Sequence, residues 1–165
     1  MFGLDVHHLL AEPIGTALEF NIEEGQQRLA DDLVVPFLRG EVKLLRTDYG
    51  LFAQGEIATQ LQIQCVNCLA PISYPLTIHL ADQFAYNPRA LAQDQDPVFP
   101  ILGKETIDLA PVLREHILLE LPLHPLCRPD CRGLCSQCGA NLNETQCDCS
   151  QEEIDPRLAV LKELL

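Results

Sequence analysis

The chain has 165 residues, 47% of them hydrophobic, and its 11 basic and 24 acidic residues give a formal net charge of −13. A chain of this size can bury a core without covalent staples, and so large a negative charge argues against unaided binding to a phosphate backbone. No apolar run approaches the ~20 residues that cross a bilayer, and the N-terminus lacks the basic and apolar regions of a secretory signal. We therefore expect a soluble, cytoplasmic protein.

The first half of the chain alternates apolar and polar residues, as antiparallel strands do. A short strand is expected over residues 17–23. Longer runs lie at 34–44 and 51–65, and turn residues at 47–50 separate them, so these runs predict a hairpin. The alternation resumes at 72–84. Together these runs predict a meander of at least three strands, with Cys65 and Cys68 at a turn between two of them.

The second half of the chain reads as a loop followed by helices. Residues 87–104 have no sustained period and contain several Pro, Gln and Asp residues, which predicts a mobile surface loop. Asp108 is expected to cap a helix that extends through Leu121, before Pro122 stops it. Asp155 is expected to cap a final short helix whose leucines pack into the core.

We expect one α+β domain, an antiparallel β-meander packed with helices and followed by a zinc-organised C-terminal segment. The length suits a single core with an appendage better than two independent cores. The expected parts are a mainly β region at 1–86, the loop at 87–104, a helical stretch at 105–126, the zinc-binding segment at 127–149 and the C-terminal helix at 150–165.

The cysteines carry the most specific chemical signal in the chain. All eight fall in closely spaced pairs, which are Cys65 and Cys68, Cys127 and Cys131, Cys135 and Cys138, and Cys147 and Cys149. A two-residue gap lets one turn present two sulfurs to a Zn²⁺ ion, and Gly139 can take the positive φ with which the chain leaves such a turn. Eight thiolates suffice for two closed sites, so we predict two structural zinc ions.

The spacing leaves the division of the eight ligands open. A local division gives Cys135, Cys138, Cys147 and Cys149 one ion, because a short loop closes that site. Cys65, Cys68, Cys127 and Cys131 would then meet across the fold. The alternative pairs the two C-x-x-C turns with each other, as zinc ribbons do. His124 is near enough in sequence to replace one cysteine, but the cysteines already suffice.

Other interpretations of the cysteines and of the polar residues are weaker. A disulfide framework would need an oxidising compartment, for which no signal is visible. A thioredoxin-like role for Cys65 and Cys68 would need a helix after them, where strand alternation continues instead. No phosphate-binding loop, dinucleotide motif or nucleophile elbow is present, and His7, His8 and His79 have no recognisable partner. His116, on the predicted helix, is expected to be a packed or surface histidine rather than a base. We expect no enzyme, and we expect Arg128 and Arg132 to offset thiolate charge locally.

These motifs resemble the YceD family of large ribosomal RNA subunit accumulation proteins. The resemblance is carried by Cys65-x-x-Cys68, by Ile107-Asp108-Leu109 leading to Leu119-Glu120-Leu121-Pro122, by the run from Cys131 to Asn143 and by Asp155-Pro156-Arg157-Leu158. Ser136 stands where the family commonly has proline, which affects no ligand.

The resemblance implies a non-enzymatic factor needed for normal accumulation of large-subunit rRNA, often encoded beside a zinc-containing ribosomal protein of the large subunit. The acidic composition fits a factor that reaches rRNA indirectly, through a basic ribosomal protein or a pre-ribosomal particle, with neither a membrane nor a small-molecule substrate. Two alternatives stay open. One is a direct RNA-binding module, and the other is a thiol redox or metal-handling protein.

Overall fold

The computed structural model describes residues 2–88, 98–103 and 105–149, which form mostly strands with few helices. The chain divides into two compact units. We call the first the sheet unit, which comprises Met1–Ile63 and Ile72–Leu123. The second, the cysteine unit, comprises Gln64–Pro71 and His124–Leu165. That the whole chain acts as a single domain stays a prediction.

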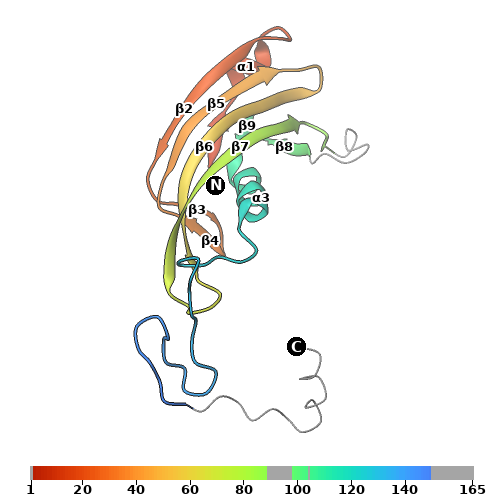
Figure 1. The fold of residues 1–165 in the computed structure, drawn as a ribbon. Coiled ribbons are helices and arrows are strands. Elements are labelled where there is room, and N and C mark those ends of the chain that lie inside the picture. The colour runs from red at the N-terminus through yellow and green to blue at the C-terminus, as the bar shows by residue number, and fades with distance from the viewer. Residues whose placement is uncertain (1, 89–97, 104, 150–165) are drawn as a thin grey trace, which may run out of the picture. The chain divides into compact units, whose positions relative to one another are not determined.

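A seven-stranded sheet dominates the described elements (Figure 1). Its order is β1 (Gly3–Asp5), β9 (Thr106–Asp108), β8 (Val98–Leu102), β7 (Pro71–Ala85), β6 (Gly50–Gln64), β5 (Leu38–Arg46) and β2 (Ala17–Glu24). The remaining elements are the hairpin of β3 (Gln27–Ala30) and β4 (Leu33–Val35) and the helices α1 (His7–Ala11) and α3 (Leu109–Glu120).

The strands predicted from alternation are present. The strand expected at 17–23 is β2, and β5 pairs with β6 as the predicted antiparallel hairpin. The amide of Thr47 donates to the carbonyl of Gly50 (3.0 Å) in the turn between them. β7 follows as the next neighbour of β6. The sheet as a whole is not a simple meander, because β8 pairs with β7 in parallel and β9 and β1 extend that edge.

Three predicted boundaries were wrong. Within the expected loop at 87–104, Val98–Leu102 forms β8, whose Phe99 ring lies 5.7 Å from that of Phe84. Its alternation is too short to detect because only Phe99 and Ile101 face the core. Val34 does not continue into β5, since it lies in β4 with 43% of its surface exposed. The helical stretch at 105–126 begins instead with β9, and α3 ends at Glu120.

The predicted cap of α3 is confirmed. The carboxylate of Asp108 accepts a hydrogen bond from the amide of Ala110 (3.0 Å), which satisfies a donor that the first helical turn leaves free. It also accepts from the amide of Phe2 (2.8 Å) and so ties β1 to the helix start. The helix expected from Asp155 lies outside the described residues.

The hydrophobic core lies within the sheet unit. Val112, Leu113 and Ile117 of α3 are fully buried together with inward residues of the sheet such as Leu44 and Ile78. Each such side chain contributes about 1.5–3 kcal/mol on burial. By contrast, the buried residues in the described part of the cysteine unit are Cys65, Cys68 and Gly133. The sheet unit thus has a core of its own, while the described part of the cysteine unit buries chiefly sulfur.

Candidate metal centres

The structure brings the eight cysteines together in two groups of four, both within the cysteine unit. The first cluster is Cys65, Cys68, Cys127 and Cys131, and the second cluster is Cys135, Cys138, Cys147 and Cys149. Within each group, all sulfur atoms lie within 4.8 Å of one another. This is the local division expected from sequence, and the ribbon-type pairing of the two C-x-x-C turns is not the one that the sulfur positions show.

A tight turn positions the first C-x-x-C pair. The amide of Cys65 donates to the carbonyl of Ala70 (2.9 Å), and the amide of Leu69 donates back to the carbonyl of Cys65 (3.0 Å). Leu69 closes the turn with a φ of 59°, a left-handed conformation that is uncommon for leucine. The turn therefore brings the sulfurs of Cys65 and Cys68 within 4.8 Å of each other.

The second C-x-x-C pair uses the same turn. The amide of Cys135 donates to the carbonyl of Ala140 (2.8 Å), and the amide of Gly139 donates to the carbonyl of Cys135 (2.9 Å). Gly139 has a φ of 71°, which confirms the conformation that the sequence predicted for it. Two segments far apart in the chain therefore present their thiols in the same local geometry.

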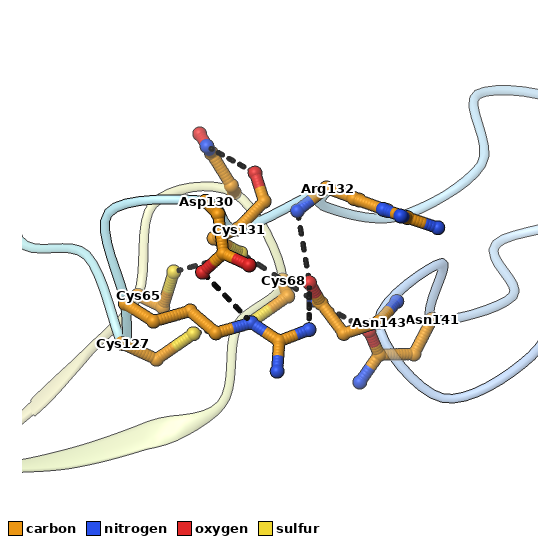
Figure 2. Close-up of polar contacts among 10 residues, drawn as sticks. Cys65, Cys68, Cys127, Asp130, Cys131, Arg132, Asn141 and Asn143 are labelled. Atoms are coloured by element: carbon orange, nitrogen blue, oxygen red, sulfur yellow. Dashed lines mark hydrogen bonds and ion pairs between the residues drawn. The ribbon is translucent and has the colours of Figure 1, made fainter.

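The sulfur positions of the first cluster fit a tetrahedral ion (Figure 2). Cys65 Sγ lies 3.8 Å from Cys131 Sγ, and Cys68 Sγ lies 3.6 Å from Cys127 Sγ. Four sulfurs at about 2.3 Å from a central Zn²⁺ are separated by about 3.8 Å. A disulfide would bring two sulfurs to about 2.05 Å, and all eight cysteines are free thiols here.

Thiolate charge is unevenly favoured across the first cluster. Burial opposes ionisation of Cys65, yet backbone amides of Cys68, Cys127 and Asn67 lower the pKa of this thiol to about 6. Contact with the Cys68 thiol, together with burial, raises the pKa of Cys127 to about 12. Backbone amides thus favour ionisation of Cys65, whereas the neighbouring thiol and burial oppose ionisation of Cys127. A bound dication would favour the thiolate form of all four cysteines.

The second cluster repeats this asymmetry and is more accessible. Amides of Cys138 and Gln137 lower the pKa of Cys135 to about 6, while the nearby Cys138 thiol and burial raise the pKa of Cys149 to about 12. Cys138 and Cys149 are exposed, whereas Cys65 and Cys68 of the first cluster are buried. A chelator would therefore reach the second cluster more easily.

Sequence reasoning missed Asn143 as a residue of the site. Its amide nitrogen donates to Cys131 Sγ (3.4 Å), a sulfur of the first cluster (Figure 2). Burial opposes ionisation of Cys131, but this hydrogen bond is the largest of the contacts that lower the pKa of the thiol. Asn143 ends the run from Cys131 that resembles the YceD family, which was the signal in the sequence. A single asparagine in such a run does not reveal which sulfur it contacts.

Other polar residues lie away from the thiols or find other partners. His124 is exposed and belongs to neither cluster. Arg128 pairs with Asp130 (3.5 Å) and donates to Asn143, so its first partners are not sulfurs. The expectation that His7 and His79 lack a partner was wrong, because they pair with Glu105 and Glu56. His116 packs at 2.8 Å from the buried Asp82, which agrees with its expected role as a packed histidine.

A sheet unit with its own core, joined to a unit that gathers eight thiols in two clusters, defines a small cysteine-rich β protein. Residues 53–165 match the family model described as large ribosomal RNA subunit accumulation protein YceD. This match spans more than half of the chain, so the chain belongs to the YceD family. The family is named for accumulation of large-subunit rRNA rather than for a catalytic activity.

Several relatives are similar over part of the chain. An uncharacterized protein of Mycobacterium tuberculosis is 38% identical over 118 residues, which cover 70% of this chain and 56% of the relative. The uncharacterized protein YlbN of Bacillus subtilis is 27% identical over 77% of this chain and 71% of its own length. The chloroplastic large ribosomal RNA subunit accumulation protein YCED homolog 1 of Arabidopsis thaliana is 44% identical over 57 residues, 34% of this chain and 17% of that protein.

The chain spans just over half the length of the mycobacterial relatives that it matches. No solved structure matches it. Among the described residues, no helix is both long and apolar enough to cross a membrane.

Proposed function

We propose that this protein is a non-enzymatic, zinc-binding accessory factor that supports accumulation of large-subunit rRNA in the cytoplasm by binding a basic ribosomal protein or a pre-ribosomal particle. The family assignment gives the process. The charge and the cysteine clusters suggest how this chain takes part. Zinc has a structural role in this proposal, because four thiolates close the coordination shell and leave no open position for chemistry.

The burial pattern of the cysteine unit is the observation that supports zinc. Its described residues bury Cys65, Cys68 and Gly133 but no large apolar side chain. A unit of this size cannot offset the entropy of ordering its backbone without a hydrophobic core, a disulfide or a bound metal. The separations of 3.6 and 3.8 Å between thiol sulfurs fit ligands of one metal ion and not a disulfide. Structural zinc contributes about 10–16 kcal/mol in small peptides, which is ample here.

The placement of the cations supports a protein partner over direct RNA binding. Four cations of the described residues are already engaged locally. They are Lys43 with Glu19 (3.7 Å), Arg46 with the carbonyl of Gly50 (2.9 Å), Arg114 with Asp32 (2.8 Å) and Arg128 with Asp130 (3.5 Å). RNA binding needs a patch of free Lys and Arg, whereas a charge of −13 steers the chain toward a basic protein.

The partner is tested by titrating zinc-loaded protein against purified large-subunit ribosomal proteins and against a naked large-subunit rRNA fragment. We expect a ribosomal protein to bind, more weakly as salt increases, and to stay bound after nuclease treatment. Tight binding to the RNA alone would favour the RNA-binding module instead.

Zinc content is measured separately by elemental analysis of protein purified without chelator, and a value near zero with free thiols would remove the metal from the proposal.

A further inference from the structure

Asn143 connects the two cysteine clusters. It lies on the segment 139–146, which joins Cys138 and Cys147 of the second cluster. Its side chain nevertheless donates to the sulfur of Cys131 (3.4 Å), a member of the first cluster (Figure 2). One side chain carried by the loop of one cluster therefore touches a thiol of the other.

The partners of Asn143 define which way its amide points. On one side it meets the backbone amide of Arg132 and the guanidinium of Arg128, both at 2.8 Å. Both groups only donate hydrogen bonds, so the atom that faces them is the oxygen. The NH₂ group must then face Cys131 Sγ and the side-chain oxygen of Asn141, which lies 2.8 Å away. The N–H···S contact follows from the hydrogen-bond network.

The backbone reinforces this link. The amide of Leu142 donates to the carbonyl of Gly133 (3.0 Å), and Leu134 forms an isolated antiparallel bridge with Asn141. The amide of Leu134 also donates to the carbonyl of Asn67 (3.1 Å), inside the first C-x-x-C turn. The loop of the second cluster is thus fastened to the short stretch between Cys131 and Cys135, which supplies one thiol to each cluster.

We propose that Asn143 is a positioning residue that couples metal binding at the two clusters. Metal at the second cluster holds the ends of segment 139–146, which keeps the Asn143 amide against Cys131 and raises the affinity of the first cluster. By thermodynamic linkage, metal at the first cluster raises the affinity of the second by the same factor. The inference rests on the proposed metal role and adds to it a coupling free energy between the two clusters of the cysteine unit.

Four variants of the full chain test this coupling. Cys147→Ser breaks the second cluster, and Asn143→Asp keeps the shape and the accepting oxygen but replaces the N–H donor with a carboxylate oxygen. The third combines the two substitutions. Gln146→Ala, at an exposed position of the same segment, is the matched control. The zinc affinity of each cluster is measured by competition with a chromogenic chelator, and cysteine alkylation read by mass spectrometry identifies which cluster holds the ion.

We expect Cys147→Ser and Asn143→Asp each to lower the zinc affinity of the first cluster by about 10-fold or more, as loss of outer hydrogen bonds does at other metal sites. Combining them should add little, because both break the same link. With Co²⁺ in place of zinc, Asn143→Asp should also shift the sulfur-to-metal charge-transfer band of the first cluster to longer wavelength. Gln146→Ala should change neither readout.

The outcomes separate the coupling from the metal role. Two bound ions with a first-cluster affinity that neither Cys147→Ser nor Asn143→Asp alters would overturn the coupling and leave the metal role intact. If Asn143→Asp lowered the zinc affinity without shifting the charge-transfer band of the first cluster, Asn143 would only support the loop and the proposed contact with Cys131 would be overturned. If neither cluster of the unaltered protein bound zinc, the proposed metal role would be wrong, and the coupling with it.

Discussion

Leu69 and Gly139 occupy the same position in the two C-x-x-C turns, four residues after the first cysteine, and both have a left-handed φ, of 59° and 71°. Both donate their amide to the carbonyl of that cysteine. Glycine adopts this conformation freely, whereas a residue with a Cβ is strained there by about 1–2 kcal/mol. The first turn therefore retains a strain that the second avoids.

We predict that relieving this strain stabilises the first turn. Leu69→Gly should gain about 0.5–1 kcal/mol, since the relief exceeds the added freedom of glycine in the unfolded chain. Leu69→Ala is the control, because it removes the same half-exposed side chain but keeps the strained conformation. Gly139→Ala should destabilise the second turn by about 1–2 kcal/mol. Urea unfolding monitored by cysteine reactivity measures all three, and equal effects of Leu69→Gly and Leu69→Ala would contradict the strain argument.

Removing metal should unfold the cysteine unit and spare the sheet unit. Among the described residues, the hydrophobic core lies in the sheet unit, so its packing should not depend on the thiols. After chelator treatment, hydrogen exchange should become fast in 64–71 and 124–149 and stay slow in β5, in residues 50–63 of β6 and in α3. The exposed Cys138 and Cys149 should become reactive before the buried Cys65. Loss of protection in β5 at the same chelator concentration would show that the two units unfold together.

Single cysteine substitutions should each remove one ion. Cys147→Ser should leave one zinc bound by the first cluster, and Cys65→Ser should leave one bound by the second, because the sulfurs form separate groups of four. The number of ions per chain, measured by elemental analysis under zinc excess, checks this. If Cys65→Ser instead exposed Cys135 and Cys138 to alkylation under zinc excess, the ribbon-type pairing would replace the observed grouping.

Sequence patterns predicted the features that depend on local periodicity. The alternation in β6, the Asp108 cap of α3 and the positive φ of Gly139 each follow from a few neighbouring residues. The parallel pairing of β8 with β7 was not predictable in this way, because strand partners are chosen by contacts distant in sequence. The left-handed φ of Leu69 also escaped prediction, since the residue type argues against it.

The candidate site shows the same limit. Spacing favoured the division in which Cys127 and Cys131 meet Cys65 and Cys68, but it left the ribbon-type pairing open, and the sulfur positions were needed to choose between the two. The contact of Asn143 with Cys131 Sγ likewise depends on how segment 139–146 folds back. The cysteines thus indicated metal binding, and tertiary structure was needed to show which residues lie together in each cluster.

The ion pair of His7 with Glu105 should stabilise the sheet unit most strongly in mildly acidic solution. The hydrogen bond and charge of Glu105 raise the pKa of His7 above its usual 6.5, so its contribution is present below pH 6.5 and is lost as pH rises through the raised value. His7 in turn lowers the pKa of Glu105 from its usual 4.5, so that contribution is present above pH 4.5 and is lost as pH falls through the lowered value. The window of full effect is therefore pH 4.5 to 6.5.

A double-mutant cycle of His7→Gln and Glu105→Gln measures this effect. Urea unfolding followed by circular dichroism should give a favourable coupling free energy at pH 5.5 that fades by pH 8.5 and weakens with added salt. The His7 side chain is 65% exposed and that of Glu105 is 37% exposed, so salt should screen the pair. A coupling free energy of the same size at both pH values would mean that the contact acts as a neutral hydrogen bond.

Finally, we predict that Gly55 tolerates no side chain. It pairs with Val42 across β5 and β6, and a Cβ at this position would lie 2.1 Å from the carbonyl oxygen of Glu41. Because that atom belongs to the backbone, the two strands would have to separate, and Gly55→Ala should lower the free energy of unfolding by about 3 kcal/mol or more. Gly25→Ala is the matched control in the same unit, since a Cβ there meets nothing within 4 Å. Urea unfolding followed by circular dichroism compares the two variants, and a loss for Gly55→Ala no greater than for Gly25→Ala would show that β5 and β6 separate easily at this point.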